Sequence, residues 1–349
     1  MKRFRIEIFQ RNLSFRSFAE VSDPDVTTDF LCLTESTVEC VGVVECVRGD
    51  FVQLRENGTV FFQGVIQDYD YDGKKTEIQL MPLASVLKTE VFADVTLLRT
   101  QSIETWMSNL LSGYFNGSDP EQNLPGFIIT SESSTNGTYA ETSNGVYNLF
   151  DLSVSFFKVY GVILNITFDP KLMRFFFTLK QVSETPLKLD LSISDVTEYD
   201  VEASISDDRP NKIVVTNKDD PSESMTYYWH PTEFSGTIDT DGTKNRVVPV
   251  ITHCDVVSVD EDQTFQEASY SAAENSLYKT RYDDLITVTI KKDSKVIPIG
   301  EIGSLYKLYD KGNVYNTMLT GIHEENGRYV ELTFGYVRKR LTQILKMRK

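Results

Sequence analysis

The chain has 349 residues, of which 40% are hydrophobic and 25% are charged, and its formal net charge is −16 at pH 7. This length allows two to four domains, and the acidic charge argues against a general nucleic-acid binder, which would present a basic surface to phosphates. No apolar run approaches the roughly 18 residues of a membrane span, and the N-terminal sequence lacks the apolar core of a signal peptide. We therefore expect a protein made in the cytoplasm without stable membrane insertion, and rich in sheet because Phe, Tyr and β-branched residues are abundant.

Residues 1–98 are predicted to form a first small β-barrel domain. Apolar and polar residues alternate over 4–8, which predicts an opening strand. Residues 20–37 are acidic and rich in turn formers, and 38–47 predict a second strand region. Residues 49–80 then predict a three-stranded meander, because Asn-Gly and Asp-Gly turns separate its alternating runs.

Residues 99–186 are predicted to form an α+β domain. An apolar stripe at helical spacing over 103–114 predicts a helix, with Ser102 as its N-cap. A second helix is expected at 148–160, and a β-hairpin at 161–180. The helical stripes are interpreted as core faces and not as ligand sites.

The rest of the chain is predicted to form a second barrel in two pieces. Alternating strands place 187–230 and 284–335 in this barrel, and 231–283 form a small inserted domain. Residues 336–349 are predicted to form a basic C-terminal helix. The expected fold is therefore mainly β, with two related small barrel (tube) domains and two smaller α/β units.

The two predicted meanders, Gly49–Leu80 and Gly303–Phe334, are similar to each other although they lie far apart in the chain. Each has a hairpin glycine and then a glycine followed by a β-branched residue: Gly58 and Gly312, then Gly64 and Gly321. The spacing between the first and the second glycine differs by three residues between the two copies, so we expect a local insertion in one copy. A duplicated barrel explains the similarity, although any two meanders share some features.

Candidate chemistry is sparse. Asp68, Asp70, Asp72 and Gly73 match the first half of a calcium loop, but Gln79 stands where the bidentate Glu is needed, so a plain turn is the better interpretation. The four cysteines form no CxxC pair and are interpreted as free thiols. Hydrolase, nucleotide-binding and metalloprotease motifs are absent from the sequence. We predict no catalytic residue, no metal, no cofactor and no enzymatic activity.

The order of these motifs resembles the baseplate hub of phage tails and the N-terminal structural region of tail-associated lysins. Each motif is weak alone, and the resemblance spans nearly the whole chain. The segments that carry it are Gly49–Gly64, Ile103–Tyr114, Asn148–Lys180, Asn211–Asn217 with Tyr227-Tyr228, and Gly303–Phe334 with the final helix.

The resemblance implies a structural virion protein at the tail tip, assembled in the cytoplasm of the host bacterium. It implies a homotrimer whose six barrels form a ring that continues the tail tube, while DNA passes an acidic lumen without specific binding. Tail-tube proteins, the tape-measure protein and a tip spike or receptor-binding protein would be its partners. Family members that cut peptidoglycan carry that domain beyond the final helix, so such activity is not implied. Alternatives are a receptor- or glycan-binding tail protein and a tail-associated peptidase.

The basic C-terminal helix is the predicted subunit or partner interface. Its basic residues are opposed by an apolar side that would pack against a barrel or a neighbouring subunit, although a solvated helix end is an equally simple interpretation. The residues assigned to this interface are Arg338, Lys339, Arg340, Leu341, Ile344 and Leu345.

Overall fold

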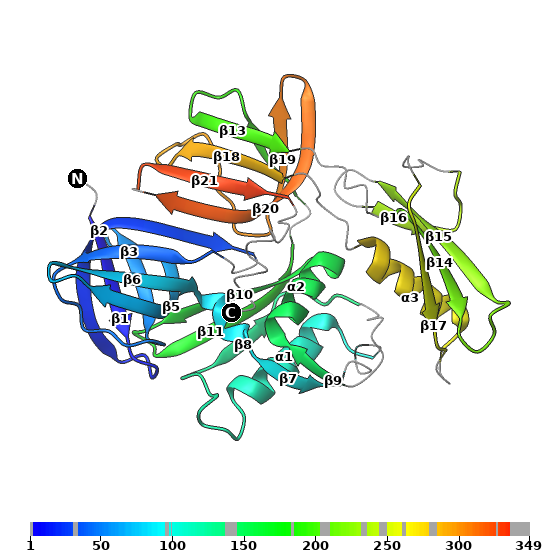
Figure 1. Ribbon diagram of the computed structural model, residues 1–349, viewed down its shortest axis with the longest axis horizontal. Coiled ribbons are helices and arrows are strands. Elements are labelled where there is room, and N and C mark those ends of the chain that lie inside the picture. The colour runs from blue at the N-terminus through cyan, green and yellow to red at the C-terminus, as the bar shows by residue number, and fades with distance from the viewer. Residues whose placement is uncertain are drawn as a thin grey trace.

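The computed structural model divides into two barrels, a central α+β unit and a fourth, lateral unit (Figure 1). The mainly β fold class predicted from the sequence is confirmed. The residues that the structure describes are 3–30, 34–94, 98, 100–136, 145–182, 185–202, 210–231, 236–243, 250–259, 263–278, 285–325 and 327–335.

The first barrel is a closed sheet of six strands. In space the order is β1-β4-β5-β6-β3-β2, and β2 returns to pair with β1. Alternate side chains point inward and are fully buried, among them Ile6, Val38 and Ile78. The strands are β1 (Phe4–Phe9), β2 (Phe15–Asp29), β3 (Ser36–Val41), β4 (Phe51–Glu56), β5 (Thr59–Tyr71) and β6 (Lys75–Pro82).

Strand β2 corrects one prediction, because it runs through part of the segment 20–37 that was expected to be rich in turns. The pairing of β2 with β3 shifts register between Val21 and Asp23. Such a bulge lets an acidic Asp-Pro pair remain within a strand. Long-range pairing therefore overrides the local turn signal here.

The α+β unit contains the predicted helices and hairpin. Ser102 caps α1 (Ile103–Phe115) by accepting a hydrogen bond from the backbone N–H of Thr105, and Asn148 caps α2 (Leu149–Tyr160). The strand β7 pairs with β9 in this unit, so the chain enters it ahead of residue 98. The helices pack on a sheet in which β8 is parallel to β11. The strands are β7 (Glu90–Ala93), β8 (Ile128–Ser131), β9 (Gly145–Asn148), β10 (Val162–Asp169) and β11 (Arg174–Gln181); the short 3-10 helix η1 (Leu83–Leu87) precedes them.

The second barrel is built from two pieces of the chain. Its order is β12-β19-β20-β21-β18-β13, and its core includes Leu308, Leu332 and Phe334. The strands are β12 (Leu187–Asp190), β13 (Val196–Glu202), β18 (Leu285–Lys291), β19 (Leu305–Asp310), β20 (Asn313–Glu325) and β21 (Tyr329–Phe334).

The lateral unit begins earlier in the chain than predicted. Residues 211–230 were assigned to the second barrel, but they form β14 and β15 of a separate four-stranded sheet. Their alternating apolar side chains, such as Ile213, pack on Ala273 and Leu277 of α3 and not on the barrel core. The elements are β14 (Lys212–Asn217), β15 (Ser224–Pro231), β16 (Gly236–Asp239), β17 (Thr252–Val257) and α3 (Phe265–Tyr278).

The two barrels repeat the same strand order and share two register shifts. Strands β4, β5, β6, β3 and β2 correspond in order to β19, β20, β21, β18 and β13. In β5 the register against β6 shifts between Ile66 and Asp68, and in β20 the register against β21 shifts between Leu319 and Gly321. The shift in β2 likewise has a counterpart in β13. Two features differ: β1 is antiparallel to β4 while β12 is parallel to β19, and the register shift between Leu54 and Arg55 in the β4–β5 ladder has no counterpart in the β19–β20 ladder.

The strand register corrects the expected insertion. Gly64 in β5 and Thr317 in β20 are structurally equivalent, because each pairs with the second residue of the strand that precedes its own in the chain. Gly64 and Gly321 are therefore not equivalent, and neither copy has a three-residue insertion. The turn glycines do correspond, each with positive φ: Gly49 with Gly303, Gly58 with Gly312, and Gly73 with Gly327.

Candidate assembly interface

The two barrels are joined by a strand pair within the chain. The second half of β2 leaves the first barrel and runs antiparallel to β20, from Asp25 opposite Glu325 to Asp29 opposite Gly321. Within this ladder, His323 Nε2 lies 2.8 Å from Asp25 Oδ1. Both barrels thus belong to one continuous twelve-stranded sheet.

A lysine from the second barrel also reaches the first. Lys292 Nζ lies 2.7 Å from Glu56 Oε2 and also bonds Glu324, and all three side chains are only 14–16% exposed. The ammonium group stands 4.7 Å from the centre of the Phe61 ring. Burial alone would lower the pKa of Lys292, but the hydrogen bonds to Glu324 and Glu56 outweigh it and the pKa is raised. The lysine therefore stays charged and holds two carboxylates together.

Close packing at a glycine adds to this junction. Gly327 has φ +60° in the turn between β20 and β21. A Cβ at this position would lie 2.2 Å from the ring of Phe4, which itself packs edge-on against Phe61. The approach of the two barrels therefore depends on glycine at this turn.

Side-chain amides and an ion pair fix the α+β unit to both barrels. Gln53 and Gln63 of the first barrel donate to the carbonyl oxygen of Phe168 over 3.1 and 2.7 Å. Lys180 Nζ lies 2.5 Å from Glu301 Oε2 in the second barrel segment. The three units are thus held at defined positions relative to each other.

The duplication leaves two strand edges open among the described residues. The edge strand β13 pairs with β18 on one side only. Beyond Ile66, β5 pairs with β6 on one side, so Asp68–Tyr71 offers its other edge. In the second barrel the equivalent part of β20, Gly321–Glu325, is the part that receives β2. The two open edges, on β13 and β5, therefore correspond to the edges of β2 and β20 that pair with each other inside the chain.

The exposed tyrosines at the open edge of β5 suit contact with protein. On β5, Tyr69 and Tyr71 are 43% and 45% exposed. Exposed tyrosines are enriched in protein interfaces, since the ring supplies apolar area and the hydroxyl a hydrogen bond. On β13 the exposed side chains include Asp200 and Glu202.

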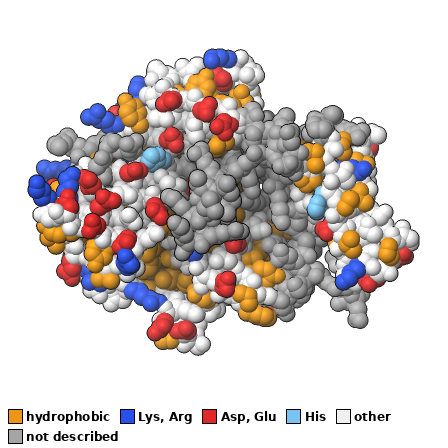
Figure 2. Space-filling model, viewed as in Figure 1, with side chains coloured by type: hydrophobic (Ala, Val, Ile, Leu, Met, Phe, Trp, Pro, Cys, Tyr) orange, Lys and Arg blue, Asp and Glu red, His pale blue; other side chains and the backbone are white. Residues whose placement is uncertain are grey.

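Acidic residues line up across neighbouring strands of the first barrel. Asp70, Glu77 and Glu39 are direct neighbours on β5, β6 and β3, and Lys75 pairs with Glu39. The second barrel has Glu331 where the first has Glu77. Figure 2 shows that acidic side chains predominate around the junction of the barrels on the face in view.

In the segment Asp68–Gly73, the carboxylates of Asp68 and Asp72 make hydrogen bonds within the protein. Arg48 bonds Asp68 and lowers the pKa of that carboxyl, and the backbone N–H groups of Lys75 and Lys74 do the same for Asp72. Across the described ranges no cluster of three or more potential metal ligands occurs. Within the same ranges no helix is long and apolar enough to cross a bilayer.

The described cysteines are unreactive or isolated. Cys40 and Cys46 lie buried in the first barrel, where burial raises their pKa values to about 12 and about 11, so neither is a thiolate at neutral pH. Cys254 is exposed and free, in the lateral unit.

The predicted interface residues Arg338, Lys339, Arg340, Leu341, Ile344 and Leu345 lie outside the described residues. The open edges, by contrast, were not found from the sequence, although the repeated meander was the signal that leads to them.

No protein-family model matches the sequence, and no curated protein matches it either. Among solved structures, a tail protein from Neisseria meningitidis MC58 aligns over 95% of this chain and 96% of its own, with a TM-score of 0.57 and 12% identity. The 43 kDa tail protein of prophage MuSo2 from Shewanella oneidensis aligns over 97% and 98%, with a TM-score of 0.55 and 13% identity. The chain has the fold of phage tail proteins.

A prophage tail protein from Listeria monocytogenes EGD-e shares this tail-protein fold over 98% of this chain and 97% of its own, with a TM-score of 0.52 and 11% identity. The resemblance predicted from the order of the motifs is confirmed for the fold. The tail-protein fold extends over almost the full length of each of these chains.

Proposed function

We propose that the protein is a structural component of a phage tail, the baseplate hub at the tail tip, where three copies form a ring of six barrels. The observation that carries this proposal is the pairing of β2 with β20, which joins two equivalent barrels in one chain. The equivalent edges, on β13 and β5, remain open for the next copy. A heterologous contact of this kind closes into a ring when each step turns through the required angle.

The internal junction supplies a register for the junction between copies. Thr27 faces His323 in the β2–β20 ladder. The register shifts place Glu202 of β13 where β2 has Thr27, and Asp70 of β5 where β20 has His323. Glu202 of one copy would therefore face Asp70 of the next. Three such contacts and three internal ladders would complete the ring.

The charge pattern fits a channel that DNA crosses without adhesion. With the acidic row of the first barrel facing the lumen, carboxylates repel phosphate and do not hold it. The ring would continue the tail tube, and tail-tube proteins, the tape-measure protein and a spike or receptor-binding protein would be its neighbours. Arg338–Leu345 would contact one of these neighbours. The role is architectural, in a virion assembled in the bacterial cytoplasm, and uses no catalysis.

A second candidate function, glycan binding, is favoured by a cleft in the lateral unit. This cleft, of about 370 Å³, has Tyr270 at its edge and Asp239 and Glu267 among its lining. Aromatic and carboxylate side chains together can hold sugars. Binding of the protein to a glycan array would support this function if the variant Tyr270→Ala loses the binding while it keeps the oligomeric mass of the wild type.

The experiment that tests the hub proposal is a mass measurement of the purified full chain by light scattering, followed by class averages in negative stain. We expect the mass of three 39.7 kDa chains and ring-shaped particles with six lobes. A chain that stays monomeric at high concentration would contradict the proposal.

A further inference from the structure

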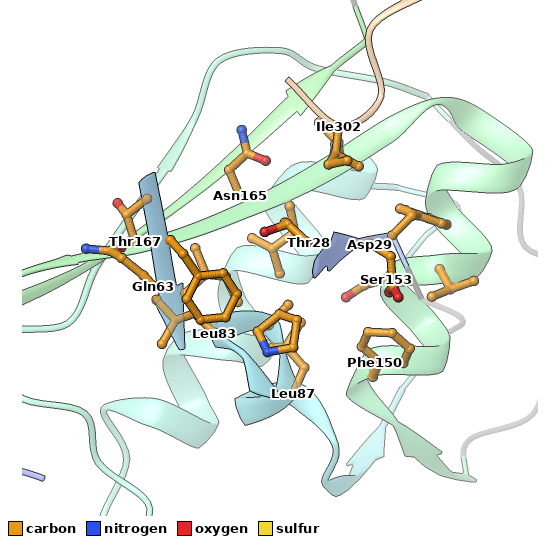
Figure 3. A pocket seen from close by; sticks show the side chains of 18 of the residues that line it. Thr28, Asp29, Gln63, Leu83, Leu87, Phe150, Ser153, Asn165, Thr167 and Ile302 are labelled. Carbon is orange, nitrogen blue, oxygen red and sulfur yellow. The ribbon is translucent and has the colours of Figure 1, made fainter. Parts of the chain in front are cut away.

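A cavity of about 440 Å³ opens where the first barrel, the α+β unit and the second barrel meet. Leu83, Leu87 and Phe150 form an apolar floor, and polar residues such as Asp29 and Asn165 stand around it (Figure 3). The volume falls in the range of pockets that bind ligands or anchor side chains. The wall residues come from elements distant in sequence, which the junction contacts hold in place.

We propose that residues 336–349 bind in this cavity of their own chain, with Leu341, Ile344 and Leu345 on the apolar floor and the basic residues outward. This inference deepens the proposed function, because it assigns a binding place to the apolar side of the segment that would contact a neighbouring tail protein.

The course of the last strand brings the segment to the cavity. Gly335, the last described residue, donates its N–H to the carbonyl oxygen of Met318 over 2.8 Å. Met318 packs in a small core with Phe30 and Ile302, and both of these residues line the cavity. The segment therefore starts beside the cavity wall. As a helix it would extend about 21 Å, which is enough to cross the opening.

Charge and apolar character also match. The segment contains six Lys and Arg residues and no acidic residue. At the rim stands Asp29, and Asn165 links the rim to Glu301 by a hydrogen bond of 3.4 Å. Because Glu301 is already paired with Lys180, Asp29 is the carboxylate that favours a basic segment over an acidic one. The apolar floor favours an occupant that also has an apolar side.

Site-directed cross-linking in the full chain tests this inference. Ala84 lines the cavity, so the variant Ala84→Cys, Leu341→Cys in a Cys32→Ser, Cys254→Ser background should react with a short bis-maleimide within one chain. The matched control replaces Leu341→Cys by Gln343→Cys, on the opposite side of the expected helix. Because docking raises the effective concentration of one thiol near the other, we expect about tenfold more cross-link than in the control.

The position and mass of the cross-link decide the outcome. Peptide mapping that joins residues 84 and 341 at the mass of one chain supports the inference. Equal yields in the two variants, or a product at the mass of two chains, would overturn it. Since the product is scored at the mass of one chain, the result does not depend on ring formation, and failure here is distinct from failure of the hub proposal.

Limited trypsin digestion gives a second, independent readout. Ala84→Trp fills the cavity and should release the bound segment, so that its backbone at Arg338, Lys339 and Arg340 can enter the protease, and we expect cleavage there about tenfold faster than in the wild type. Ala84→Ser, which leaves the cavity open, is the control and should behave like the wild type. Equal cleavage rates in all three proteins, each shown to be folded by its thermal transition, would contradict the inference.

Discussion

Glu104 shows at the residue scale how a buried charge is kept in this fold. It lies in the first turn of α1 with no solvent exposure. Its carboxylate accepts hydrogen bonds from Ser133 Oγ, Thr135 N and Thr135 Oγ1, each at 2.7 Å. Burial raises the pKa of Glu104, but these hydrogen bonds outweigh it, and the pKa lies below its ordinary value. The carboxylate thereby holds residues 133–135 on the helix.

We expect Glu104→Gln to lower the free energy of unfolding by about 2 kcal/mol at pH 7, because the amide loses charge-assisted hydrogen bonds. A depressed folded-state pKa stabilises the protein above the unfolded-state pKa, and this contribution disappears as pH falls through the folded-state pKa. The gap between wild type and variant should therefore shrink in acid. Urea unfolding at pH 7 and at low pH, with the exposed Glu121→Gln as the control, measures it. A gap that is constant with pH would contradict the assigned ionisation.

At the scale of helices and strands, the sequence correctly predicted the elements that local residue patterns determine. The apolar stripe and Ser102 predicted α1, and the turn glycines predicted the hairpins of both meanders. The strand β2 was missed because its pairing with β20, far away in the chain, outweighs the turn-rich sequence. Strand β14 was recognised as a strand but assigned to the wrong sheet, since alternation shows that a face is buried and not what buries it.

Lys292 makes a largely buried ionic contact with Glu56 of the first barrel and with Glu324 of the second. Replacing Lys292→Met removes the cation and leaves two poorly exposed carboxylates beside each other. We expect a loss of about 3 kcal/mol in the free energy of unfolding. The matched control is Lys75→Met, whose partner Glu39 and own side chain are 40% and 51% exposed, and it should cost less than about 1 kcal/mol. Equal losses in urea unfolding would show that Lys292 does not hold the barrels together.

At the scale of the whole molecule, the barrels and the α+β unit form a frame that repeats one junction. Inside the chain the junction uses the second half of β2 and the second half of β20. The sequence predicted the duplication. It did not predict the open edges, because a strand lies at an edge only if no other strand pairs with that side of it. The predicted interface at 336–349 lies outside the described residues and stays a prediction.

The most direct test of the ring is a cross-link at the register that the internal junction defines. The full chain with Glu202→Cys and Asp70→Cys, in a Cys32→Ser, Cys254→Ser background, is oxidised gently and its mass is measured under denaturing conditions. The account predicts a closed covalent trimer of three 39.7 kDa chains, since these positions face each other across neighbouring copies. The control Glu202→Cys with Tyr69→Cys should give far less, because adjacent residues in a strand point to opposite faces. Equal yields from both pairs, or products no larger than one chain, would contradict the pairing of β13 with β5 and with it the ring.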